Sequence, residues 1–94
     1  MLDAIANPRR REILRLVWDR ELSAGDIAAR FDVSWPAISQ NLAILRKAGL
    51  VTERREATHR FYQADLQALG SLQAVLQEMW SQDLDRLRTV VEER

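Results

Sequence analysis

Hydrophobic residues recur at helical spacing over the first half of the chain. The spacing predicts one helix from Pro8 to about Asp19, preceded by a short apolar segment at residues 1–6. Ser23 is the expected N-cap of a second, short helix that runs through Arg30. The apolar residues that define these two helices are Ile13, Leu14, Leu16, Val17, Ile27, Ala28 and Phe31.

A further helix is predicted from residue 35, after a three-residue turn at 32–34. Ser34 is its expected N-cap, and Gly49 lies just past its end, where a left-handed residue often terminates a helix. Pro36 is compatible with the first turn, because the N–H that proline lacks would have no helical partner there. One face of this helix carries the apolar residues Ile38, Leu42 and Leu45.

After Gly49 the period of the hydrophobic pattern changes from helical to strand-like. The runs VTERRE and HRFYQA, at 51–56 and 59–64, predict a β-hairpin. A glycine is usual at such a tip, but this chain has Glu56-Ala57-Thr58 around the turn. The pattern therefore predicts the hairpin without specifying its turn type.

From Asp65 onward a long apolar stripe predicts a short helix and a long one, separated at Gly70. A helix of about twenty residues is roughly 30 Å long, about the width of the whole domain. Part of its apolar face must therefore meet another surface, and we predict a homodimer formed by residues 1–6 and 70–93. A helix folded back over its own domain is the alternative. The predicted dimer contacts are Leu2, Ile5, Met79, Trp80, Leu84, Leu87 and Val91.

Two helices joined by a short turn, with the small residue Ala28 in the first, are typical of DNA-binding helix-turn-helix proteins. This unit is predicted at residues 23–48, and the hairpin at 50–64 adds a wing. Within the turn, Asp32 is expected to adopt a positive φ, which aspartate tolerates. The predicted fold class is mainly α: a winged helix-turn-helix with about five helices and a two-stranded hairpin, dimeric through its terminal helices.

Outward residues at the start of the 35–48 helix are candidates for base recognition, because this end of a recognition helix meets base edges in the major groove. Gln40 can pair bidentately with adenine, and Ser39 can bond a base or a phosphate. Trp35 presents an apolar face to thymine methyls or the sugar-phosphate edge; packing on the preceding helix is its alternative role. The predicted DNA contacts are Ser34, Trp35, Pro36, Ser39, Gln40, Arg54, Arg55, His59 and Arg60.

The net charge is zero, but the charges are unevenly distributed. Residues 34–64 carry five basic and two acidic side chains, a balance of +3, whereas residues 65–94 carry three basic and six acidic ones, a balance of −3. A basic middle suits a chain that presents only this part to a polyanion. Chance asymmetry of a solvated surface explains the same numbers equally well.

Composition excludes several classes of protein. The 94 residues are expected to form one domain, 1–94. The absence of cysteine excludes disulfides and thiolate metal sites. With one histidine and no glycine-rich phosphate loop, we predict no enzymatic activity and no cofactor. No apolar run approaches the roughly 18–20 residues of a membrane span and no signal peptide is recognisable, so a cytoplasmic protein without a membrane partner is expected.

Three segments resemble the ArsR/SmtB-type winged-helix repressors over about residues 3–65: NPRRREILRLV, ELSAGDIAARFDVSWPAISQNLAILRKAGLV and the RRE…HRFYQ hairpin. The tail, with MWSQDLDRL, is similar to the autorepressor-like branch of that family, which ends in a Trp-containing dimerisation helix. The resemblance implies a homodimer that binds a double-stranded DNA operator near its own promoter and blocks transcription. For a two-fold dimer, the operator is expected to be an inverted repeat.

Metal-sensing members of this family carry ELCVCDL where this chain has ELSAGDI, so Ser23 and Gly25 stand at the positions of the thiolate ligands. A hydroxyl and a bare glycine cannot replace thiolates. Another metal site of the family uses His and acidic residues from paired C-terminal helices, but the only histidine here is His59, on the wing. We therefore predict no metal site. Relatives often have Arg or Gln at position 35 and His at position 41, so their base preferences do not transfer.

The alternative function is a protein-interaction module, an adaptor or antirepressor that has lost DNA binding. The zero net charge and Trp35 favour it, and the local balance of +3 over residues 34–64 opposes it. Arginines on the hairpin can also serve only to deter strand-edge aggregation. No motif indicates a small-molecule effector. Trp18, Met79 and Trp80 could line a cavity between dimer helices, although such residues at helical spacing usually belong to a core.

Overall fold

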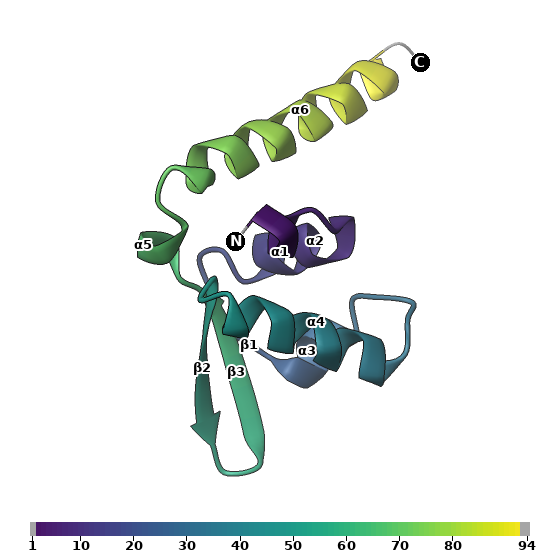
Figure 1. Cartoon of the computed structure of the whole chain (residues 1–94). Coiled ribbons are helices and arrows are strands. Elements are labelled where there is room, and N and C mark those ends of the chain that lie inside the picture. Colours follow the sequence, from purple (N-terminus) through teal and green to yellow (C-terminus); the bar gives the residue numbers. More distant parts are fainter. Residues whose placement is uncertain (1, 93–94) are drawn as a thin grey trace.

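The computed structural model describes the backbone of residues 2–92 and the side chains of residues 3–82. The side chains of four predicted dimer contacts, Leu2, Leu84, Leu87 and Val91, lie outside the described residues. The helices are α1 (Leu2–Ile5), α2 (Pro8–Leu16), α3 (Ala24–Ala28), α4 (Trp35–Lys47), α5 (Leu66–Leu69) and α6 (Leu72–Glu92). The strands are β1 (Leu22–Ser23), β2 (Val51–Glu56) and β3 (His59–Ala64), as Figure 1 shows.

The three strands form one antiparallel sheet in the order β1-β3-β2. The predicted hairpin runs, 51–56 and 59–64, match β2 and β3. The predicted two-stranded sheet is incomplete, because β1 pairs with β3 through Leu22 opposite Tyr62 and Ser23 opposite Phe61. Two residues are too few to show an alternating pattern. Ser23 was recognisable only in its other role, as the N-cap whose Oγ accepts a hydrogen bond from the Asp26 N–H at 3.0 Å.

Two helix ends differ from the prediction. Helix α2 ends at Leu16 rather than near Asp19, and α3 ends at Ala28 rather than at Arg30. Both continue briefly in tighter turns, with the Trp18 N–H bonded to the Arg15 carbonyl and the Arg30 N–H to the Ile27 carbonyl. Such i→i−3 bonds extend the helical pattern of side chains beyond the helix itself. The predicted break at Gly70 is confirmed, with φ at 54° between α5 and α6.

The turn between α3 and α4 is longer than predicted because α3 ends early. It spans residues 29–34, and Ala57 is the one non-glycine residue with positive φ among the described residues. Asp32 therefore does not adopt the expected left-handed conformation. A reversal spread over six residues needs no single left-handed position, whereas a three-residue turn does.

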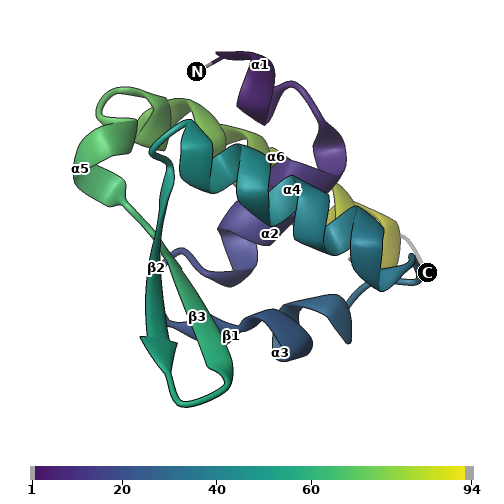
Figure 2. The ribbon, with the colours of Figure 1, turned by 60° about the horizontal axis from the view of Figure 1, so that its bottom comes forward.

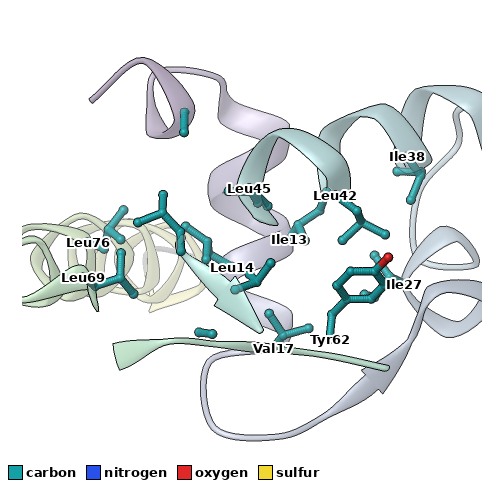
Figure 3. Packing of buried hydrophobic residues seen from close by; sticks show 14 residues of the cluster. Ile13, Leu14, Val17, Ile27, Ile38, Leu42, Leu45, Tyr62, Leu69 and Leu76 are labelled. Atoms are coloured by element: carbon teal, nitrogen blue, oxygen red, sulfur yellow. The ribbon is translucent and has the colours of Figure 1, made fainter. Parts of the chain in front are cut away.

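The core joins α2, α3 and α4 to the sheet and to the start of α6. Residues with no exposed surface come from each helix of this group, including Leu14, Ile27, Ile38 and Leu76. Figure 3 shows Leu42 and Leu45 of α4 close to Ile13 of α2. Ile38 lies further toward the start of α4, on the side of Ile27 of α3, and the Tyr62 ring lies between the sheet and the helices. The predicted inward face of α4, Ile38, Leu42 and Leu45, is thereby confirmed.

The C-terminal helix α6 has 21 residues and extends from the core (Figures 1 and 2). Leu76 anchors its first half, whereas Val75 and Met79 are 52% and 36% exposed. No helix of the described chain combines the length and apolar character needed to cross a membrane.

The hairpin tip carries backbone strain at Ala57, whose φ is 55°. Glu56 pairs with His59, so the loop is Ala57-Thr58, and a positive φ at its first residue alone is the pattern of a type II′ turn. Glycine normally occupies that position because an L side chain is strained there.

We expect Ala57→Gly to raise the free energy of unfolding by about 1 kcal/mol, because it removes this strain. Urea unfolding measures the change. The matched control is Ala43→Gly on the exposed face of α4, where the same chemical change should destabilise by about 1 kcal/mol. Equal effects at the two positions would contradict the strained tip.

Candidate nucleic-acid interface

Helix α4 begins with an exposed face built from the predicted recognition residues. The Ser34 Oγ accepts a hydrogen bond from the Ala37 N–H at 3.3 Å, and Pro36 lies in the first turn, as predicted. Ser39 and Gln40 are exposed one turn further along. Because Ile38, Leu42 and Leu45 hold the opposite face in the core, this exposed face has a fixed orientation.

Trp35, the first residue of α4, is 52% exposed. It lines a groove together with Ala24 and Gly25 of α3 and with residues of the wing. The alternative role for Trp35, a purely structural residue, accounts only for its covered half.

The wing arginines lie on two different faces of the sheet. Neighbouring residues of a strand point to opposite faces, so Arg54 and Arg55 are separated by the thickness of the sheet. The register places Arg55 opposite Arg60, and Arg54 opposite Phe61. The face of Arg55 and Arg60 also carries the buried residue Tyr62, so it continues from the core toward the tip.

Arg54, on the other face of the sheet, has its guanidinium held by two carboxylates of the protein. Its guanidinium contacts the Glu21 carboxylate through Nε at 3.0 Å and Nη2 at 2.7 Å, and the Glu56 carboxylate through Nη1 at 2.8 Å. It also lies over the Phe61 ring, 4.7 Å from the centroid. Hydrogen bonding to Arg54 lowers the pKa of Glu21, and the two carboxylates raise the pKa of Arg54. Arg54 thus links β2 across β3 to the segment before β1, which leaves it less suited than Arg55 or Arg60 to bind phosphate.

Arg55 and Arg60 form a like-charge pair directly across the hairpin. Both are exposed, and Arg55 has one contact with a carboxylate, from Nε to Glu53 at 3.4 Å. Like charges directly opposite each other destabilise a pair of strands. The arrangement therefore favours an anion placed between or beside the two guanidinium groups.

Glu53 connects α4 to the wing. Its carboxylate accepts a hydrogen bond from the Tyr62 hydroxyl at 3.1 Å and lies 3.7 Å from the Arg46 Nε at the end of α4. Burial tends to raise the pKa of Glu53, but the hydrogen bonds from Tyr62 and Arg55 and the charge of Arg46 bring it below its ordinary value. The carboxylate therefore remains charged at neutral pH and holds α4 against β2.

A groove of about 370 Å³ lies between the start of α4 and the wing tip. Trp35 and Ser39 line one side, and His59 and Arg60 line the other, with residues 23–25 at its base. The groove therefore brings together four of the nine predicted DNA contacts, two from α4 and two from the wing. Gln40 is exposed but does not line the groove, and neither do Arg54 and Arg55.

A buried contact between α2 and α4 was not predicted. Asn41 is 7% exposed; its Nδ2 donates to the Ala37 carbonyl, and its Oδ1 accepts from the Arg10 Nη1 at 3.3 Å. Arg10 also donates from Nε to the Ala4 carbonyl at 2.6 Å and from Nη2 to the Asp3 carbonyl at 3.1 Å. A signal for it existed, because Asn41 interrupts the apolar face of α4, where a polar side chain needs a partner.

The predicted dimer contacts differ in how much of each is available to a partner. Met79 is 36% exposed, and Val75, which was not predicted, is 52% exposed one turn earlier. Ile5 is half-buried, and Trp80 packs edge-on against Trp18 with ring centroids 4.9 Å apart. Trp18 and Trp80, but not Met79, line a shallow cavity of about 330 Å³ between α2 and α6.

The positions expected for thiolate ligands in metal-sensing relatives have other roles here. Ser23 caps α3, and Gly25 lies in the first turn of that helix. Among the residues that the structure describes, no group of three His, Asp or Glu side chains could hold a metal ion.

Comparison with known proteins gives consistent matches over most of the chain. Residues 7–53 match the bacterial regulatory proteins of the arsR family. The chain is 39% identical over 82 residues to the transcriptional activator HlyU of Vibrio cholerae, a match covering 87% of this chain and 76% of that protein. It is 41% identical over 59 residues to the transcriptional repressor SdpR of Bacillus subtilis, covering 63% and 66% of the two chains. A solved structure of a possible transcriptional regulator for arsenical resistance has a TM-score of 0.72 at 40% identity, covering 94% of this chain and 92% of that one.

Proposed function

Since this chain belongs to the arsR family of bacterial regulatory proteins, we propose that it is a dimeric repressor that binds an inverted-repeat operator and does not respond to metals. Membership confirms the predicted family and the winged helix-turn-helix fold. The members are DNA-binding transcriptional regulators and not enzymes, which confirms that prediction too.

The observation that carries the proposal is the position of Arg55 and Arg60. They face each other on the exposed part of the hairpin, and Arg60 lines the same groove as Trp35 and Ser39 of α4. A duplex whose major groove receives α4 brings its phosphates toward the wing, where the two guanidinium groups can bind them. Gln40 is then placed to pair with adenine, and Ser39 with a base or a phosphate.

Dimerisation is proposed from the unpartnered part of α6. Val75 and Met79 leave apolar surface exposed on a helix that extends from the core, and the apolar pattern continues in the sequence through Leu84, Leu87 and Val91. A two-fold dimer presents two recognition helices and therefore favours an inverted repeat. Bound at a promoter, such a dimer blocks transcription.

Indifference to metals is proposed from the chemistry at positions 23 and 25. A serine that caps a helix and a glycine without a side chain offer no soft ligand to a thiophilic metal.

Selection of bound sequences from random duplex DNA tests the proposal. An inverted repeat with half-sites about one helical turn apart, or somewhat more, is expected. Zinc or copper added to the selected complex should leave the DNA bound. Failure to enrich any duplex would favour the adaptor role, and release at stoichiometric metal would overturn the proposal of a metal-independent repressor.

We expect Arg60→Ala to weaken binding to the selected operator and to an unrelated duplex alike. The logarithm of the binding constant falls as the logarithm of the salt concentration rises. Loss of one phosphate contact should make this negative slope less steep by about one. Fluorescence anisotropy at several salt concentrations measures it.

Arg54→Ala is the matched control, because that guanidinium is bound to Glu21 and Glu56 on the other face of the sheet. Its slope should match that of the unmodified protein. If Arg54→Ala made the salt dependence of binding less steep by as much as Arg60→Ala, the two faces of the wing would not differ as proposed.

A further inference from the structure

Three large hydrophobic residues are exposed among the described residues: Trp35, Val75 and Met79. Val75 and Met79 belong to α6, so Trp35 is the one within the described helix-turn-helix and wing. Nothing in α4 requires an indole at this position. Ser34 already caps the helix, and Pro36 occupies its first turn. Leaving half of an indole in water forfeits the free energy that its burial would supply. The exposed half is therefore expected to have a partner outside the chain.

The surroundings of Trp35 limit what that partner can be. The indole forms one wall of the groove whose other wall carries His59 and Arg60. Ser39 follows four residues later on the same side of the helix and lines the same groove. A partner that covers the indole therefore also meets the Arg60 guanidinium and the Ser39 hydroxyl. These groups suit a polyanion that carries an apolar group.

We propose that Trp35 recognises the 5-methyl group of a thymine in each operator half-site, an inference that rests on the proposed DNA-binding function. Among the base edges of the major groove, the thymine methyl is the apolar group. Trp35 is the first residue of the helix whose N-terminal positions face those edges, so its indole can cover the methyl while Gln40 pairs with a neighbouring base. Contact with deoxyribose would bury the indole equally well, but it would carry no preference for thymine.

The test replaces single thymines with deoxyuridine, which removes the methyl and keeps every hydrogen-bonding group. In the selected operator, one thymine per half-site should be sensitive. Its replacement should weaken binding about fourfold, the value for burial of one methyl group, and replacement in both half-sites about fifteenfold. Deoxyuridine at the other thymines should have little effect.

Two variants show whether the methyl acts through Trp35. Trp35→Ala should bind the thymine and deoxyuridine operators alike, with only a small fall in melting temperature, because about half of the residue is covered by the protein. Gln40→Ala, the matched control, should bind both more weakly yet keep the fourfold preference for thymine. If Trp35→Ala unfolds, Trp35→Gln serves in its place. Binding of the unmodified protein to the thymine and deoxyuridine operators can be compared without any variant.

The outcomes separate this inference from the proposed function. Tight operator binding by the unmodified protein with no sensitive thymine, or a consensus without thymine in its half-sites, would overturn the role of Trp35 and leave the repressor intact. Discrimination retained by Trp35→Ala would assign the methyl contact to another residue and also overturn it. Failure to select any duplex would overturn the proposed function itself.

Discussion

Replacing Val75 and Met79 together with glutamate should convert the proposed dimer to a monomer and weaken operator binding by roughly 100-fold or more. The two side chains are 52% and 36% exposed on α6, one helical turn apart. In the proposed dimer they are covered, and two carboxylates buried without partners would be costly. A monomer holds one half-site at a time and loses the gain from simultaneous binding to both.

Sedimentation gives the oligomeric state, and titration of a full operator and of a single half-site gives the two affinities. The half-site affinity should change little, because α4 and the wing are unaltered. Gln77→Glu, on an exposed part of the same helix, is the control and should remain dimeric. A double variant that stays dimeric would show that the partner covers another surface. The apolar pattern of the sequence predicts that replacing Leu84 and Leu87 together with charged residues gives a soluble monomer or an unfolded chain.

Ile38→Ala should lower the free energy of unfolding by about 2–5 kcal/mol, the usual range for an Ile deleted from a close-packed core. Ile38 has no exposed surface and lies on the inward face of α4, in the core shared with Ile27 of α3 (Figure 3). For a domain of this size each kcal/mol corresponds to about 4–8 °C in melting temperature, so a fall of roughly 8–40 °C is expected.

Circular dichroism during heating measures the shift. Ser39→Ala, the adjacent and exposed position, should leave the melting temperature nearly unchanged while it weakens DNA binding. A loss below about 1 kcal/mol for Ile38→Ala would contradict the packing of the helix-turn-helix unit.

Local features of the fold were predictable from the sequence because their signals lie within a few residues of one another. Ser34, Pro36 and the apolar positions 38, 42 and 45 were sufficient to place α4. The alternation in VTERRE and HRFYQA gave both long strands. Strand β1 escaped prediction because its pairing with β3 depends on residues about forty positions away, which no local pattern encodes.

Long-range polar contacts account for most of what the sequence did not reveal about the site. Arg54 contacts Glu21 across 33 positions, and Arg10 contacts Asn41 across 31. Strand parity alone separates Arg54 from Arg55, but only the register places Arg60 opposite Arg55. The sequence therefore did not show that Arg60 shares the face of Arg55, or that Arg54 is held by Glu21 and Glu56.

Arg10 limits which substitutions this sequence can accept, because it donates hydrogen bonds to three groups at once. One planar guanidinium serves the Ala4 and Asp3 carbonyls and the Asn41 side chain through three different nitrogens. Lysine has a single ammonium and cannot reproduce that fork, so the usual exchange of Arg for Lys is not conservative here. A nonpolar residue at position 41 would in turn remove the acceptor that Arg10 uses on α4. Positions 10 and 41 are therefore expected to change together in descendants of this protein, although neither belongs to the proposed DNA contacts.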